Sequence, residues 1–132
     1  MDRISDLANY RLQKAKEDLQ AAKLLFEQDH FAQSINRSYY AIFHSVRALL
    51  AFDKFDSRKH SGIISFFDKE YIKNEKLAKQ LSKILHSAEE IRINSDYDDF
   101  FITTKEDSEK QINNAIIFIN EIEKYLSNFL EN

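Results

Sequence analysis

The sequence contains no cysteine and no proline, and only one glycine. The absence of cysteine excludes disulfides and thiolate zinc sites, and it fits a reducing compartment. A single glycine leaves no glycine-rich loop to hold a nucleotide phosphate, which excludes P-loop and Rossmann proteins. An all-β chain needs many tight turns, so the shortage of glycine and proline favours long helices.

Long apolar runs are also missing. No stretch approaches the ~20 apolar residues of a membrane span, and the first ten residues lack the apolar core of a signal peptide. The sequence therefore predicts a cytoplasmic protein without a membrane partner. Its 132 residues, of which 43% are hydrophobic and 31% charged, are typical of one folded domain, residues 1–132.

The net charge of −3 is small, but the charges are sorted along the chain. Residues 54–83 contain eight basic and four acidic side chains, whereas residues 89–109 contain eight acidic and two basic ones. Such sorting either steers a polyanion to one region or reflects ordinary solvated helix faces of mixed sign.

Hydrophobic periodicity predicts four long helices and one short helix, an all-α up-and-down bundle. We expect helices at about 5–28, 34–50, 62–71, 74–93 and 104–130. Ser57 or Ser61 is a candidate cap for the short helix, and Asn74 for the helix that follows. Residues 94–103 have no helical period, and Thr104 with Asp107 resembles a capping box.

The central element is the helix at 34–50. Its apolar residues recur at steps of three and four and form one stripe: Ile35, Tyr39, Ile42, Val46 and Leu49. Small residues form another face: Ser34, Ala41, Ser45 and Ala48. These small residues allow a second helix to come close, and we expect them to form the interface of a homodimer through the central helix.

Arg37 and His44 lie seven residues apart, nearly superposed, opposite the apolar stripe. Histidine can give or take a proton near neutral pH, and arginine binds phosphate oxygens. Together they suit cleavage of a phosphodiester at the ribose 2′-hydroxyl. The alternative is structural: His44 is a hydrogen-bonded core histidine and Arg37 an ion-pair partner.

Neighbouring residues are candidates for holding a substrate. Tyr39 points with the core stripe, whereas Tyr40 lies nearer Arg37 and either stacks on a base or packs in an interface. Arg47 and the lysines of residues 76–83 are further candidates for holding a strand. A di-metal carboxylate site would need Glu-x-x-His on two helices, and only Glu27 with His30 matches, so we expect no metal and no cofactor.

The stretch RSYYAIFHSVRALL, residues 37–50, resembles the HEPN family, in its small stand-alone bacterial and archaeal branch. Two further segments support the resemblance. HSGIISFF, residues 60–67, is similar to the segment that follows the family's first helical hairpin. Arg92, Asp96 and Tyr97 are similar to its arginine-then-Asp-Tyr pattern near the end of the fourth long helix.

The resemblance implies a dimer in which two arginine–histidine motifs meet in a shared cleft. It implies a metal-independent ribonuclease, with His44 as the acid–base group and Arg37 as the stabiliser of phosphate charge. The partner would be RNA or a nucleotide, and a small nucleotidyltransferase antitoxin would restrain the toxin. Asp96 and Tyr97 would belong to the substrate-binding residues.

Active family members often carry Asn, Asp or His directly after the arginine, where this chain has Ser38, which we expect at the substrate. Other members keep the fold and only bind. The sequence therefore leaves a second hypothesis open, a non-catalytic dimeric helical module that binds a nucleotide or a nucleotidyltransferase.

Overall fold

The computed structural model describes residues 2–129, and within that range it contains helices and no strand. The α-helices are α1 (Arg3–Glu27), α2 (Phe31–Leu50), α3 (His60–Phe67), α4 (Lys79–Tyr97) and α5 (Lys105–Leu126). A 3₁₀ turn, η1 (Ala51–Asp53), follows α2, and a π-helical turn, η2 (Asp68–Ile72), continues α3. The predicted all-α bundle of four long helices and one short helix is confirmed.

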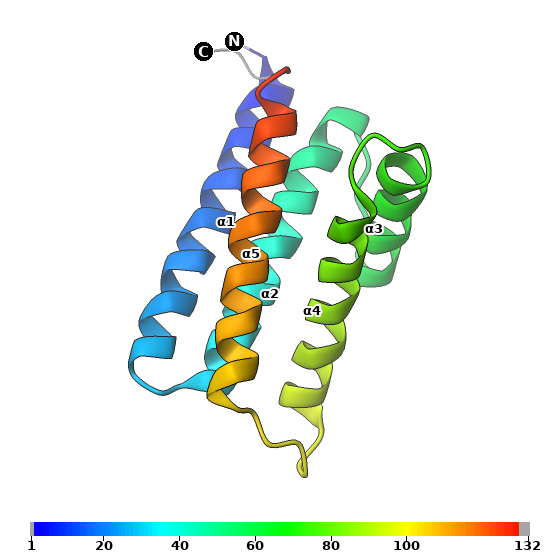
Figure 1. The fold of residues 1–132 in the computed structure, drawn as a ribbon. Coiled ribbons are helices and arrows are strands. Elements are labelled where there is room, and N and C mark those ends of the chain that lie inside the picture. The colour runs from blue at the N-terminus through cyan, green and yellow to red at the C-terminus, as the bar shows by residue number, and fades with distance from the viewer. Residues whose placement is uncertain (1, 130–132) are drawn as a thin grey trace.

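The four long helices alternate in direction, with α2 inside the bundle and in contact with α1, α4 and α5 (Figure 1). The turn between α1 and α2 is short, and Asp29 there has a left-handed backbone with φ 62°. So short a connection makes the two helices antiparallel neighbours. Among the described residues, no helix is both long and apolar enough to cross a bilayer.

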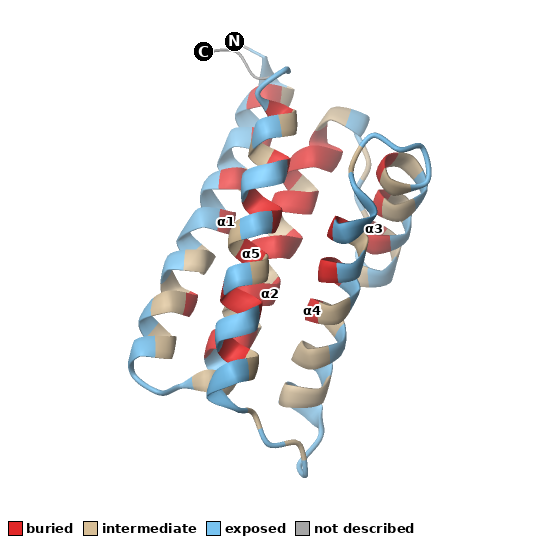
Figure 2. Cartoon of the chain, viewed as in Figure 1, coloured by how far each residue is buried: buried red, intermediate tan, exposed pale blue. Residues whose placement is uncertain are grey.

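The apolar stripe of α2 lies in the core, as predicted, and Figure 2 shows α2 buried along much of its length. The small-residue face is equally buried, against α1: the Ser34 hydroxyl donates to the Ala22 carbonyl over 2.8 Å. Ala41 and Ala48 have no exposed surface within one chain. The prediction that this face forms a dimer interface is therefore wrong, because the face already packs inside the bundle.

The segment between α3 and α4 differs from its prediction. Neither Ser57 nor Ser61 occupies the N-cap of α3, which is Lys59, although the Ser57 hydroxyl accepts the Lys59 N–H. Asn74 does not cap α4 either, because α4 begins five residues later, at Lys79. The intervening chain turns through Glu75, whose φ of 59° is incompatible with a continuing helix.

The ends of the other helices follow local signals. The Asp2 carboxylate accepts the Ile4 N–H, so α1 begins slightly before the predicted start at residue 5. The capping box of Thr104 and Asp107 is confirmed. Helix α4 continues through residues 94–97, where we expected a break. Helix α5 ends at Leu126, and the predicted end at residue 130 lies outside the described residues.

Candidate functional site

Arg37 and His44 lie side by side on α2 and face one carboxylate, Asp18 of α1. Arg37 Nη1 donates to Asp18 Oδ1 over 3.0 Å, and His44 Nε2 lies 3.5 Å from Asp18 Oδ2. The Asp18 and His44 side chains are 16% and 17% exposed, and that of Arg37 is 36% exposed. The three side chains therefore form one polar centre at the α1–α2 seam, open to solvent on the arginine side.

Arg37 keeps part of its donor capacity. Its Nε and Nη2 donate to the Asn36 side-chain oxygen over 3.1 and 2.8 Å, and its Nη1 donates to Asp18. A guanidinium has five N–H donors, so two N–H groups remain for another acceptor. The arginine is thus positioned by its neighbours and still able to bind an anion.

His44 is held in its neutral form. Burial lowers the pKa of His44 below its usual value, and the nearby Lys14, Arg47 and Arg37 lower it further, while Asp18 opposes the shift. Its Nδ1 is buried without a hydrogen-bond partner among the described residues. A neutral imidazole has a ring nitrogen that can accept a proton, although its lowered pKa makes His44 a weaker base than a free histidine.

Tyr40 is the centre of an aromatic and cationic cluster above this site. The Arg37 guanidinium lies 4.9 Å from its ring centroid, and that of Arg92, from α4, lies 5.9 Å away. The His44 and His60 rings lie 6.1 and 5.8 Å from it. Side chains from α2, α3 and α4 therefore converge on one half-buried tyrosine, which confirms that Tyr40 lies on the Arg37 side.

His60 begins α3 and is fixed by aromatic neighbours. Its ring stacks on Phe43 at 4.2 Å, and its Nδ1 lies 2.9 Å from the Tyr39 hydroxyl. Burial lowers the pKa of His60, and the charge of Arg92 lowers it further. Burial raises the pKa of Tyr39, so its hydroxyl stays protonated next to the His60 ring.

Arg47 lies one turn beyond His44 and lines an open groove of about 490 Å³ with Phe43, Asp56, Ser57, Arg58 and His60. Its Nη2 donates to Asp56 over 3.0 Å, and Arg11 of α1 approaches the same carboxylate at 3.7 Å. Burial alone would raise the pKa of Asp56, but the Ser57 N–H and the charge of Arg47 lower it.

Asp96 lies at the opposite end of the α2 surface. Its carboxylate accepts the Asn36 amide over 3.1 Å and lies 3.8 Å from Arg92 Nη1. Asp96, Asn36 and Arg37 share a second depression of about 460 Å³. Tyr97 is 74% exposed at the last residue of α4.

Two other predicted groups lie elsewhere. Ser38 is fully buried, and its hydroxyl has no hydrogen-bond partner among residues 2–129, so it is not placed to contact a substrate. Lys76 lies over the Tyr71 ring at 5.3 Å, where it shares a depression with Tyr125 of α5 rather than with Arg37.

The sequence pattern did not single out Asp18, one of several charged residues of its helix. The short turn between α1 and α2 held the missing signal. When a short turn joins two antiparallel helices, the sequence numbers of residues that face each other add up to a nearly constant value. Ser34 and Ala22 are one such facing pair. That register puts Asp18 opposite Arg37. His60 was not recognised as part of the site either, because only the fold brings the start of α3 to α2.

Between residues 2 and 129, no three His, Asp or Glu side chains gather closely enough to hold a metal ion. The one predicted Glu-x-x-His pair, Glu27 and His30, flanks the exposed end of α1.

Comparison with known proteins agrees with this architecture. Residues 8–125 match the family model described as HEPN domain. A Methanocaldococcus jannaschii protein named "Putative toxin MJ0142" is 33% identical over 115 residues, 87% of this chain and 78% of that protein. A Thermotoga maritima UPF0332 protein is 32% identical over 126 residues, 96% of both chains.

A solved structure has the same fold. The crystal structure of ST0689, described as an archaeal HEPN homologue, superposes with a TM-score of 0.62 and 22% identity, over 94% of this chain and 98% of that one. The class is thus a helical bundle whose central helix presents an arginine–histidine pair. The chain belongs to the HEPN domain family.

Proposed function

We propose that the protein is a metal-independent endoribonuclease and the toxin component of a toxin–antitoxin pair. The observation that carries the proposal is the polar centre of Asp18, Arg37 and His44, which offers a neutral base beside an arginine with free donors. The family and the names of two relatives, both "Putative toxin" proteins, support the same function.

The chemistry needs few groups. His44 accepts the proton of a ribose 2′-hydroxyl, and the resulting oxygen attacks the adjacent phosphorus. The bond to the 5′-oxygen breaks, and that oxygen takes up the proton that His44 received, leaving a 2′,3′-cyclic phosphate, a free 5′-hydroxyl and a neutral His44. Arg37 donates its unused N–H groups to the phosphoryl oxygens, where negative charge builds up in the transition state.

Substrate contacts would come from the surface around this centre. Tyr40 lies beside His44, and Arg47 lies one turn further along α2. Asp96 shares a depression with Arg37, and Tyr97 follows it as the last residue of α4. In the proposed dimer the exposed side of α2, rather than its small-residue side, faces a second copy, so that two polar centres share one cleft. The antitoxin would be a small nucleotidyltransferase.

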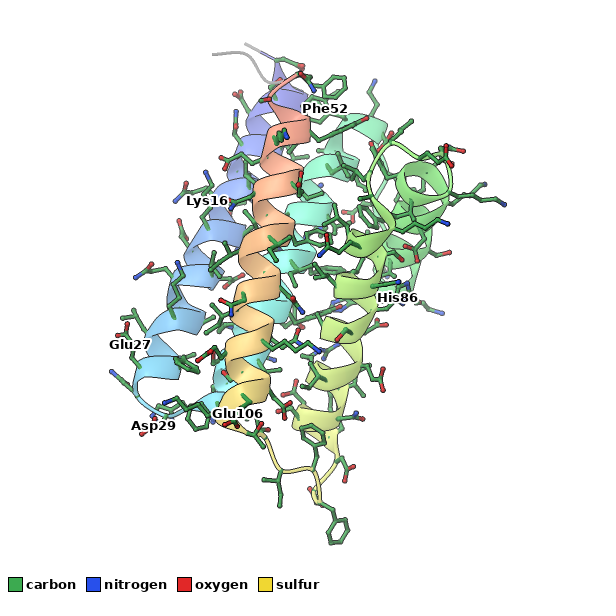
Figure 3. The ribbon with its side chains drawn as sticks, viewed as in Figure 1. Lys16, Glu27, Asp29, Phe52, His86 and Glu106 are labelled. Atoms are coloured by element: carbon green, nitrogen blue, oxygen red, sulfur yellow. The ribbon has the colours of Figure 1, made fainter. Side chains whose placement is uncertain are left out.

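The test is cleavage of a mixed RNA substrate by purified protein with chelator present. Arg37→Ala and His44→Ala should each lower the cleavage rate by about 100-fold or more, because each removes a group that acts in the transition state. The matched control is His86→Ala. His86 lies on α4 (Figure 3) and pairs with Asp68 of η2, away from the polar centre, so this substitution should leave the rate unchanged.

Cleavage that survives both substitutions would refute the assigned site. If the purified parent cleaves no RNA while its fold is intact, the protein is instead a helical module that binds a nucleotide or a nucleotidyltransferase.

A further inference from the structure

The connection between α4 and α5 carries the most exposed apolar side chains of the described chain. In this segment, residues 97–102 and hereafter the tip, Phe100 is 92% exposed, Ile102 81% and Tyr97 74%. Three large apolar groups so close together on a surface indicate an interaction site. The tip also carries Asp98 and Asp99, which form no ion pair within the described residues.

The tip has a defined conformation. The Asp98 carboxylate accepts the Phe100 N–H over 3.0 Å, and the Asp98 carbonyl accepts the Phe101 N–H over 3.1 Å. At its base, the Ser95 and Thr103 hydroxyls lie 3.2 Å apart. A segment that is already ordered loses less conformational entropy when it binds.

The groove beside Arg47 has the complementary character. Phe43 and the stacked His60 ring give it an apolar floor. Arg58 lines the groove and Lys59 follows it in the chain; both are exposed, and neither forms an ion pair with any described residue. The groove therefore offers an apolar surface beside two uncompensated positive charges, whereas the tip offers apolar groups beside two uncompensated negative charges.

The tip and the groove lie at opposite ends of one surface of α2. At about 100° per residue, Asn36, Tyr40, Phe43 and Arg47 fall within one sector of roughly 60°. Asn36 contacts Asp96, the residue just before the tip, and Arg47 lines the groove. Figure 1 shows the tip at one end of the bundle, and α3 beside the half of the bundle away from the tip.

A twofold axis makes these two features meet. If the axis crosses α2 at right angles near Tyr40, the two copies of α2 run antiparallel. The turn of α2 that contains Arg37 in one copy then lies opposite the turn that contains His44 in the other. The same operation brings the level of Asn36 against that of Ser45, and so the tip toward the groove. Because the operation is reciprocal, each dimer contains the contact twice.

We propose that the tip of each subunit docks into the groove of a second copy of this chain. Asp98 and Asp99 face Arg58 and Lys59 of the other copy, and Phe100 covers the Phe43 floor. This inference rests on the dimer of the proposed function and adds its contacts. The two tips close the ends of the shared cleft, and the two polar centres lie between them.

The experiment measures the dimer dissociation constant of the full chain by light scattering over a dilution series. The tip variant is Asp98→Asn with Asp99→Lys, in which the asparagine side chain keeps the acceptor for the Phe100 N–H. The groove variant is Arg58→Glu with Lys59→Glu. Each should raise the dissociation constant at least about 10-fold, because attraction becomes repulsion at two symmetric contacts. The variant with all four substitutions should return to within about 3-fold of the parent.

The matched control is Glu109→Gln with Glu121→Lys, which changes the charge by the same amount as the tip variant, on the exposed side of α5. It should leave the dissociation constant unchanged. The docking would be overturned if the tip or groove variant had the same dissociation constant as the parent, or if the combined variant bound no more tightly than the tip and groove variants. Either result would leave the dimer itself in place. If the parent were monomeric at every concentration, both the docking and the dimer would be overturned. The cleavage assay would still test the ribonuclease activity independently.

Discussion

Replacing Asp18 by asparagine tests whether this carboxylate organises the polar centre. The Asp18→Asn side chain keeps the shape and one acceptor oxygen but removes the charge that faces Arg37 at 3.0 Å and His44 at 3.5 Å. A hydrogen bond to a charged group contributes about 1.5–3 kcal/mol. The partial exposure of Arg37 and the remaining amide acceptor reduce the loss to about 1–2 kcal/mol.

A loss of this size is easily measured. For a chain of this length, about 1–2 kcal/mol lowers the melting temperature by roughly 3–8 °C. The substitution should also lower the pKa of His44 further, since Asp18 is the group that opposes the effects of burial and of the nearby cations. The first quantity comes from urea or thermal unfolding, and the second from the imidazole resonances in an NMR titration.

The control is Glu17→Gln, one residue away on the exposed side of α1. It removes the same charge and should change the free energy of unfolding by no more than about 0.5 kcal/mol. A His44 pKa that rises or stays constant in Asp18→Asn would refute the reasoning. So would a loss of stability no greater than that of Glu17→Gln.

Two further outcomes follow from burial. Ala48→Leu forces a larger side chain against α1 and should lower the free energy of unfolding by about 1–3 kcal/mol, as measured in urea, whereas unchanged stability would show that this face has free space. The pKa values of His44 and His60 are lowered in the folded state, so below about pH 6.5 the unfolded chain binds protons that the native chain does not. Stability should therefore fall from pH 7 to pH 5, and His60→Gln should flatten that fall, whereas an identical slope in the variant would contradict the assignment.

The sequence predicted the features that depend on neighbouring residues. The buried stripe of α2 follows from periodicity alone, and the capping box of Thr104 with Asp107 needs only a four-residue signal. Asn74 failed as a cap because the π-helical turn η2 lengthens α3 and moves the start of α4 to Lys79. Nothing in the local pattern marks such a turn.

Only part of the candidate site could be predicted from the sequence, for a similar reason. Arg37 and His44 share one helix, so their spacing shows that they are neighbours. Asp18 and His60 reach them from other helices, and their positions depend on the register of α1 and on the path of residues 51–59. Residues 94–97 were expected to leave the helix, but Asn36 binds Asp96 and Ser95 contacts Thr103, and these contacts accompany a continuing helix α4.

The close packing of α1 on α2 also affects how a mutational scan should be interpreted. The distance from Asp18 to the arginine–histidine pair is set by backbones that meet over Ser34 and Ala41, not by the reach of long side chains. If the proposed function holds, substitutions at these small residues should displace the carboxylate and lower the activity as loss of Arg37 does. Intolerance to substitution will therefore extend to positions that have no chemical role, and only assays that separate folding from turnover will distinguish the two.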